Sequence, residues 1–463
     1  MKLFSSKLLL LLLCALSFWG CEDLLEKEPP NSLLPSEAIQ SEQDLQEVLI
    51  SAYDVLANTY NGNAQNLANL MSDNVARPVA DARYESVWLR SSTIFNTFSN
   101  QIFLDWYIAV LRSNTVLENL TRIDVSEATA TRVTGEAHFI RALCHFDVVR
   151  VYAQPFGFTP DNSHPGVAIR SSSDIVSDAV APRSSVGEVY NFILDDILIA
   201  KDNLPTTNSD FANYYSAVAL EATVRFQMQQ YQLAYDLADE VIASGLFPFV
   251  ELYPVYYTFP EPTQEAMFYI FSAPLGGDAI DSRNSGFASQ WGSQGTVPNL
   301  QITEEFFDAI TQSGGPRAEL YEEVSQDGNS FWVTNVFNET NFNIPIFTMT
   351  QMMLIRAESA GMLGTNLDIA IEDINSIRSR AYSNTTNNLI GSASAEQVVE
   401  AAREEFRYEF PFTGQRTHDL KRRGAQGEDI ILRDAPWDCP ANVVQFPATE
   451  ATSQFPLNPG GGC

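Results

Sequence analysis

The chain has 463 residues, 45% of them hydrophobic, which is enough apolar material for a large globular core. Acidic residues outnumber basic residues by 58 to 27, which gives a formal net charge of −31 at pH 7. Because so acidic a surface repels phosphate backbones, the composition argues against nucleic acid as a partner.

The first twenty residues read as a secretory signal. Lys2 and Lys7 precede an apolar run that begins at Leu8 and is too short to span a membrane permanently. The run ends at Gly20-Cys21, and a small residue before cysteine marks a bacterial lipoprotein site. We therefore expect a signal peptide over residues 1–20 and acylation of Cys21. An ordinary signal with cleavage nearby is the alternative.

A helix and a polar stretch follow the signal. Residues 41–59 begin with a Ser41-x-x-Asp44 capping pattern and carry apolar residues at helical spacing. Residues 61–100 are polar and resemble a loop, with scattered aromatic side chains. A long segment without periodicity inside a compact domain usually has a function.

Helical periodicity returns at residues 103–120 and is strongest in GEAHFIRALCHFDVVRVYAQPFG, residues 135–157. This second segment has two apolar rows, one through Ile140 and Cys144 and the other through Phe139 and Leu143. A helix with two apolar rows packs against neighbours on two sides, so it should lie inside a helical array. Cys144 should be a buried, inert thiol.

The middle of the chain predicts three more helices. Residues 182–205 read as one helix, with a capping box from Ser185 to Glu188. Residues 219–245 break at Gln229-Gln230 into two amphipathic helices, with small alanines that allow close approach. This is a tetratricopeptide-like helix pair.

The segment from 246 to 345 changes character. It is rich in aromatic residues, proline and glycine, with a strand expected at 265–271 and a short helix at 303–310. We expect residues 278–299 to be a loop and residues 314–345 to be irregular. Two helices then follow at 354–364 and 370–381.

Six motifs in this order resemble the SusD/RagB family. They are the acidic start CEDLLEKE at 21–28, WYIAVLRSNTVLENL at 106–120, the segment 135–157, LIRAE at 354–358 with INSIRSRA at 374–381, EFPFTGQRTHDLKRRG at 409–424, and FPATEATSQFPLNPG at 446–460. The chain departs from the family pattern at Thr413, where glutamate is usual, and at Ala448-Thr449, where Ile-Pro is usual.

The resemblance implies a mostly α fold. Residues 21–463 should form a single domain with a tetratricopeptide-like scaffold of helix pairs. An irregular, loop-rich half, at about residues 61–100 and 246–345, should carry the ligand site.

The resemblance also implies a function. The protein should be a non-catalytic lipoprotein of the outer membrane, facing the cell exterior, that binds oligosaccharide nutrients and delivers them to a SusC-like TonB-dependent transporter. Peptide ligands, as in the RagB branch, and a periplasmic helical-repeat scaffold remain as alternatives.

Catalytic and metal-binding arrangements are not apparent. Pairs such as Asp195-Asp196 and Glu404-Glu405 point roughly 100° apart on a helix, whereas a glycosidase needs opposed carboxylates. His138 and His145 share a helix face with Arg141, a cation that disfavours metal binding, so we expect a solvated or ion-paired face. We therefore predict no enzyme activity, no cofactor and no metal.

Charged residues near the C-terminus have a structural interpretation. The resemblance implies that they form ion pairs and carbonyl contacts that tie the C-terminal segment to the helices. These residues are Arg356, Glu358, Arg378, Arg380, Arg416, Asp419 and Arg422.

Aromatic residues in polar loops are the candidates for ligand binding. Sugars present apolar C–H faces and a fringe of hydroxyls, so they need flat aromatic platforms beside amides, carboxylates or guanidinium groups. Among the candidate aromatic platforms we rank Trp291 first, then Trp88 and then Trp332. Asp73, Asn74 and Arg77 are the candidate hydrogen-bonding partners. Further candidates in the same loops are Tyr84, Arg283 and Asn284.

Two cysteines lie in the C-terminal loop region. Cys439 and Cys463 could pair in an exported protein, and the sequence leaves open whether they do.

Overall fold

The computed structural model describes residues 39–174, 181–276, 279–293, 297–312, 314–339, 341–452, 455–460 and 463. The expected signal peptide and Cys21 lie outside these ranges. Among the residues that the structure does describe, no helix combines the length and apolar character that a membrane crossing requires.

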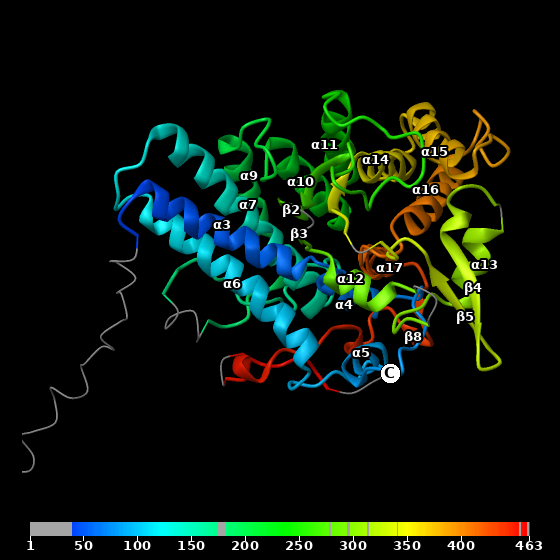
Figure 1. The fold of residues 1–463 in the computed structure, drawn as a ribbon, viewed down its shortest axis with the longest axis horizontal. Coiled ribbons are helices and arrows are strands. Elements are labelled where there is room, and N and C mark those ends of the chain that lie inside the picture. The colour runs from blue at the N-terminus through cyan, green and yellow to red at the C-terminus, as the bar shows by residue number, and fades with distance from the viewer. Residues whose placement is uncertain are drawn as a thin grey trace, which may run out of the picture.

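Helices form most of the molecule, as the sequence predicts (Figure 1). One group lies at the N-terminal end of the array and comprises α3 (Glu42–Thr59), α6 (Thr97–Asn119), α7 (Glu127–Tyr152) and α9 (Val186–Asn203). α7 packs against α6 and also against α9, and its side chains from Gly135 to Tyr152 are almost all buried. The predicted position of this helix inside an array is therefore confirmed.

Local capping explains where these helices begin. In α3 the Ser41 hydroxyl accepts a hydrogen bond from the Asp44 backbone, and the Asp44 carboxylate accepts one from the Ser41 backbone. Ser185 and Glu188 make the same reciprocal pair at the start of α9. Both capping boxes satisfy N–H groups that the first helical turn leaves without partners.

The second group of helices continues the array toward the C-terminus. α10 and α11 form the predicted pair, α14 packs on α11, and both α15 and α16 pack on α14. The ranges are α10 (Tyr214–Gln227), α11 (Tyr231–Ala243), α14 (Met349–Leu363), α15 (Leu367–Tyr382), α16 (Ala395–Glu409) and α17 (Gln415–Ala425). The predicted helices 354–364 and 370–381 are the cores of α14 and α15.

Short elements occupy the predicted loop regions. Residues 61–100 include α4 (Asn63–Asn69) and α5 (Ala82–Trp88), and the expected loop 278–299 includes α12 (Ser285–Trp291). The predicted strand and short helix are present as β1 (Ala266–Ile270) and α13 (Glu304–Thr311). β1 pairs antiparallel with β6 (Ile344–Thr348), and β2 (Ala273–Gly276) pairs with β3 (Ala279–Asp281).

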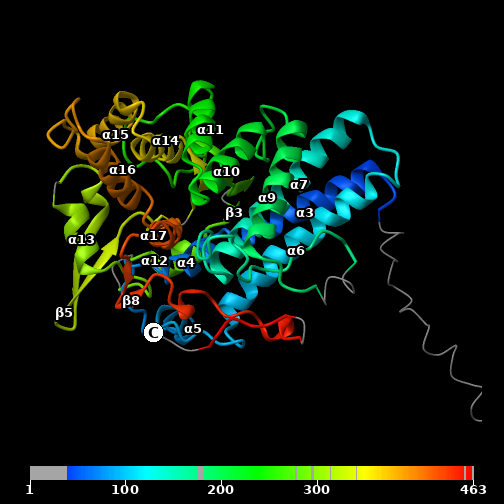
Figure 2. The same cartoon turned by 180° about the vertical axis from the view of Figure 1, so that it is seen from behind.

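The expectation of an irregular segment over 314–345 is wrong. The strands β4 (Tyr321–Gln326) and β5 (Asn329–Thr334) form a six-pair antiparallel hairpin. Its turn residues Asp327 and Gly328 both have positive φ, which is the Asp-Gly pattern of a tight hairpin turn. In both views the hairpin lies with α13 at the end of the molecule opposite α3 and α6 (Figures 1 and 2).

Ion pairs join the helices of the C-terminal half, as expected. Arg356 pairs with Asp373 at 2.7 Å, and Arg422 pairs with Glu358 at 2.9 Å. Arg380 lies in the core, 2.8 Å from Glu265 and 2.7 Å from Glu409. The predicted ion pairs are therefore present, and through Glu409 and Arg422 they join α16 and α17 to the other helices.

The histidine face is also ion-paired. His138 and Arg141 of α7 both contact Asp196 of α9 at 2.7 Å. His145 is buried.

A disulfide closes the C-terminal segment. Cys439 and Cys463 are joined, with Cα atoms 5.9 Å apart, and Cys144 is a free buried thiol. The segment between the two bridged cysteines includes β-bridge and 3-10 elements, among them η2 (Pro440–Asn442) and η3 (Ala448–Glu450).

Candidate functional site

Three segments far apart in the sequence meet at one junction. Val75 pairs with Ile302, and Ile302 pairs in turn with Trp332 of β5. The Ala76 N–H donates to the Gln301 carbonyl at 2.9 Å, and the Thr303 N–H donates to the Asn74 carbonyl at 3.0 Å. This junction unites parts of the two loop-rich regions that the sequence assigns to ligand binding.

Trp88 belongs to the junction. Its indole Nε1 donates to the Val75 carbonyl at 2.9 Å, so the half-buried ring lies against the first segment. The Arg433 guanidinium lies 4.4 Å from the ring centroid, and its Nη1 donates to the Trp88 carbonyl at 2.7 Å. One face of Trp88 is thus covered by a cation.

Asp73 and Asn74 are held by arginines of the two last long helices. Asp73 accepts two hydrogen bonds from Arg416, at 2.8 and 2.7 Å, and the Asn74 side-chain oxygen accepts one from Arg407 at 2.8 Å. Burial opposes ionisation of Asp73, but the Arg416 guanidinium outweighs burial and lowers the pKa of this carboxyl. Asn74 is buried, whereas Asp73 keeps 27% of its side chain exposed.

Trp291 is a core residue, contrary to its first rank among the candidate platforms. Only 1% of Trp291 is exposed, its Nε1 donates to the Asn66 side chain at 2.8 Å, and it packs edge-on against Phe412. The ring of Trp291 packs into the core between Asn66 of α4 and Phe412, which precedes α17. A buried ring cannot stack on a ligand, so we correct this assignment.

Two other candidates are buried as well. Tyr84 is 3% exposed and stacks on Phe98 with ring centroids 4.2 Å apart. Asn284 is 1% exposed at the start of α12. Both contribute to packing in this structure rather than to a ligand-facing surface, so these assignments are corrected too.

Arg77 and Arg283 differ in position. Arg77 is exposed next to the junction and pairs with Glu85 at 2.6 Å. Arg283 reaches α3, where it contacts Asp54 at 2.7 Å and Asn58 at 3.2 Å. The structure therefore brings together Asp73, Asn74, Arg77, Trp88 and Trp332, and it does not place Arg283 with them. The Asn74 side chain is 1% exposed and held by Arg407, so its assignment as a ligand-binding residue is corrected, as for Asn284.

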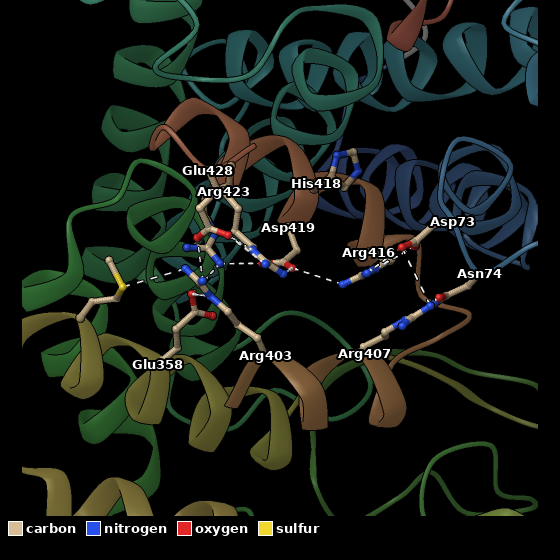
Figure 3. A network of polar contacts seen from close by, with 12 residues as sticks. Asp73, Asn74, Glu358, Arg403, Arg407, Arg416, His418, Asp419, Arg423 and Glu428 are labelled. Atoms are coloured by element: carbon tan, nitrogen blue, oxygen red, sulfur yellow. Dashed lines mark hydrogen bonds and ion pairs between the residues drawn. The ribbon is translucent and has the colours of Figure 1, made fainter. Parts of the chain in front are cut away.

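A groove with a volume of about 610 Å³ opens beside Asp73 and Asn74. Figure 3 shows arginines of α16 and α17 facing one another, with Asp73 and Asn74 at one end and Glu358 and Glu428 at the other. The lining residues with charged side chains are Glu396, Glu400, Arg403, Glu404, Arg407, Arg416 and Arg423. A wall with both donors and acceptors suits a ligand rich in hydroxyl groups.

Arg407 and Arg433 are not among the residues that the sequence suggests for the site. Each lies more than 330 positions from its partner in the junction, Asn74 or Trp88, and neither falls in a polar aromatic loop. The sequence gives no signal for contacts of that separation. The sequence indicates Arg416 only as a structural residue of the C-terminal motif, and its contact with Asp73 fits that interpretation.

Comparison with known proteins assigns the chain to a family. Residues 23–228 match a family described as starch-binding and associating with the outer membrane, and residues 332–430 match the SusD family. A SusD-like protein of Formosa agariphila is 24% identical over 463 residues, which cover 87% of this chain and 88% of the relative.

Solved structures share the fold. A SusD superfamily protein from Bacteroides vulgatus has a TM-score of 0.76 at 19% identity, and the match covers 91% of this chain and 99% of that one. A protein described as a laminarin-binding SusD-like protein has a TM-score of 0.72 at 17% identity, with 91% and 100% covered. The mostly helical architecture and the matches to both family models together show that the chain belongs to the SusD/RagB family.

Proposed function

We propose that this protein is a non-catalytic binding protein that captures oligosaccharides and delivers them to a SusC-like transporter in the outer membrane. The observation that carries the proposal is the match of its N-terminal half to a starch-binding, outer-membrane family. A structural relative described as laminarin-binding supports a carbohydrate ligand.

The junction offers the groups that a sugar needs. Trp332 and Trp88 are both half-buried and pack partly against the core, and Arg433 covers one ring face of Trp88. The apolar face of a pyranose ring would stack on these indoles, while Arg77 and the mixed-charge groove would exchange hydrogen bonds with its hydroxyls. In this proposal the protein holds the ligand and no bond of the sugar is made or broken.

A screen of the mature chain tests the ligand class. Residues 21–463, with Cys21 replaced by serine for solubility, would be titrated calorimetrically with neutral glucans, other oligosaccharides and peptides of matched length. We expect saturable binding of at least one oligosaccharide. Binding of peptides alone would transfer the role to the peptide branch, and binding of neither would contradict the proposal.

The anchor and the partner need a second experiment in cells. The proposal holds that Cys21 is acylated and that the protein covers a transporter through an interface of roughly 2,000 Å² or more. Pull-down from detergent-solubilised outer membrane should recover a large β-barrel protein. Cys21→Ala should abolish fatty-acid labelling, and surface protease should digest the wild-type protein in intact cells.

Persistent labelling of the Cys21→Ala variant would contradict the anchor. Complete protection from the protease would place the wild-type protein in the periplasm. Failure to recover a barrel protein from a host that expresses the neighbouring genes would count against the transporter role.

A further inference from the structure

A second groove, also with a volume of about 610 Å³, has no acidic side chain in its lining. One wall is the segment that follows α5, and the other is the disulfide-closed C-terminal segment. The lining residues are Met71, residues 87 and 89–95, Ala441, residues 443–445, and residues 458–460. In a chain with 58 acidic residues, a groove of this size without one is a distinct chemical environment.

Arg90 is the charged residue in the lining of this groove, and no carboxylate lies within ion-pair distance of it among the described residues. Burial lowers the pKa of Arg90, and the charge of Asp434, which is not part of the lining, opposes this effect only in part. Its Nε donates to the Asn442 side chain at 2.7 Å, and its Nη2 donates to the backbone carbonyls of Leu432 and Arg433. Its third nitrogen, Nη1, makes no hydrogen bond within the described part of the chain and is not enclosed by protein. A guanidinium group held by neutral acceptors, with one donor unused, is suited to an anion.

Arg433 adds a second cation behind Arg90, and the charge of Asp73 offsets it only in part. Its Nη1 donates to the Trp88 carbonyl, and its Nε and Nη2 are buried without hydrogen-bond partners. Burial, and then the nearby positive charge of Arg90, lower the pKa of Arg433. Buried donors without acceptors are uncommon in folded proteins, and such donors can mark the place where an ion or a ligand binds.

The backbone holds both arginines in an unusual conformation. Arg90 has φ of 59° and Arg433 has φ of 44°, in the left-handed region that residues other than glycine seldom adopt. Such residues persist where the surrounding structure fixes them, and they cluster at ligand-binding sites. Here the C-terminal wall is fixed by the Cys439–Cys463 disulfide and by the Ala448 N–H, which donates to the Ile94 carbonyl at 3.2 Å.

The rest of the groove is apolar with hydroxyl groups. Phe95 is 74% exposed and Leu89 is 42% exposed, so both lining residues present apolar side chains to solvent. The Ser92 hydroxyl is buried and has no hydrogen-bond partner among the described residues. An aromatic face beside a cation and a spare hydroxyl would match a ring that carries an acidic group.

We propose that this groove binds the acidic unit of an oligosaccharide, with the carboxylate or sulfate on Arg90 and the apolar face of the ring on Phe95. The saccharide part rests on the proposed function, whereas the preference for an anion rests on the groove itself. The mixed-charge groove beside Asp73 differs in kind, because its arginines are accompanied by carboxylates.

Two probes test the saccharide part and the anion part of this proposal separately. The first is trigalacturonic acid, compared by calorimetry with its fully methyl-esterified form, which has the same rings without the charges. The second is 8-anilinonaphthalene-1-sulfonate, an aromatic sulfonate whose fluorescence reports binding without any sugar. Each is titrated into the wild-type protein, Arg90→Gln, Phe95→Ala, and Lys201→Gln, which removes a charge that pairs with Glu221 between α9 and α10.

The wild-type protein should bind the acid at least tenfold more tightly than the ester, and the preference should weaken as salt is added. Arg90→Gln should reduce that ratio to about one and weaken binding of the sulfonate, and Lys201→Gln should change neither. Phe95→Ala should weaken acid and ester alike. Because Phe95 is exposed, this variant should keep the wild-type melting temperature even if Arg90→Gln does not.

An unchanged acid-to-ester ratio in folded Arg90→Gln, or unchanged affinities in Phe95→Ala, would overturn the proposal. So would a wild-type protein that binds neither anionic probe. Arg90-dependent binding of the sulfonate with no saccharide binding would preserve the anion groove and contradict the saccharide function. Binding of neutral saccharides without a preference for the acid would preserve the saccharide function and contradict the anion groove.

Discussion

His145 shows how a single side chain is fixed by its hydrogen bonds. Its Nε2 accepts a hydrogen bond from the Arg170 backbone N–H at 3.2 Å, so Nδ1 carries the proton and donates to the Arg141 carbonyl at 2.8 Å. A second proton on Nε2 would remove the first of these bonds. Burial lowers the pKa of His145 to about 4.

The stability of the protein should therefore fall as the pH drops through this histidine. Its folded pKa lies below the unfolded value of about 6.5, so the stabilisation is complete above pH 6.5 and declines between pH 6.5 and 4. By linkage the loss from pH 8 to pH 5 is about 2 kcal/mol. Urea unfolding at pH 8 and at pH 5 measures this loss of stability. His145→Gln has no group that titrates at this position, so between the two pH values the variant should lose about 2 kcal/mol less stability than the wild-type protein. An equal loss in both proteins would contradict the assignment.

Arg380 has the largest expected effect on stability among the charged residues that we consider. Its side chain is 1% exposed and neutralises Glu265 and Glu409, whose side chains are fully buried. Arg380→Met should destabilise the fold by roughly 3–5 kcal/mol, because the variant leaves buried carboxylates undercompensated. The urea midpoint measures this effect.

Arg83→Met is the matched control for Arg380. Arg83 makes an ion pair with Asp81 at the surface, and its side chain is 55% exposed. Breaking such a pair should change stability by less than about 1 kcal/mol. Equal midpoints for the two variants would show that the buried network adds little.

At the scale of the elements, local signals predict helices well and junctions poorly. Capping boxes and periodic apolar rows locate α3, α7 and α9 because those signals lie within one helix. The prediction of an irregular segment overlooks the β4–β5 hairpin, although Asp327-Gly328 is a typical hairpin turn. The prediction for Trp291 is wrong because a polar, glycine-rich flank says nothing about Asn66 and Phe412, which enclose the ring from distant parts of the chain.

The contact between α17 and the C-terminal segment allows a test at this scale. A Cβ atom on Gly424 would lie 2.2 Å from the Trp437 ring, so Gly424→Ala must push the segment away from the helix. We expect a loss of roughly 1–3 kcal/mol by overpacking. Gly391→Ala is the control, because a Cβ there meets nothing within 4 Å. An equal decrease in the melting temperatures of Gly424→Ala and Gly391→Ala would contradict this packing.

At the scale of the whole molecule, distant segments assemble the candidate site on a helical scaffold. Arg407 and Arg416 reach Asn74 and Asp73, and Arg433 covers one face of Trp88. The family resemblance places the site in the loop-rich regions, but which loop residues face outward depends on these long-range contacts. The sequence can therefore indicate the region and not the orientation of each side chain.

The most direct test of the saccharide site compares two tryptophans in the same binding experiment. With an oligosaccharide identified by the screen, Trp332→Ala should weaken binding severalfold to tenfold and keep the melting temperature, because stacking contributes on the order of 1 kcal/mol. Trp291→Ala should instead lower stability by roughly 3–5 kcal/mol, because it empties a core position. Trp88→Ala should weaken binding to a similar extent, but it also removes the hydrogen bond to the Val75 carbonyl and the ring beneath Arg433, so its melting temperature should fall. Full affinity in both Trp332→Ala and Trp88→Ala would contradict the proposed site.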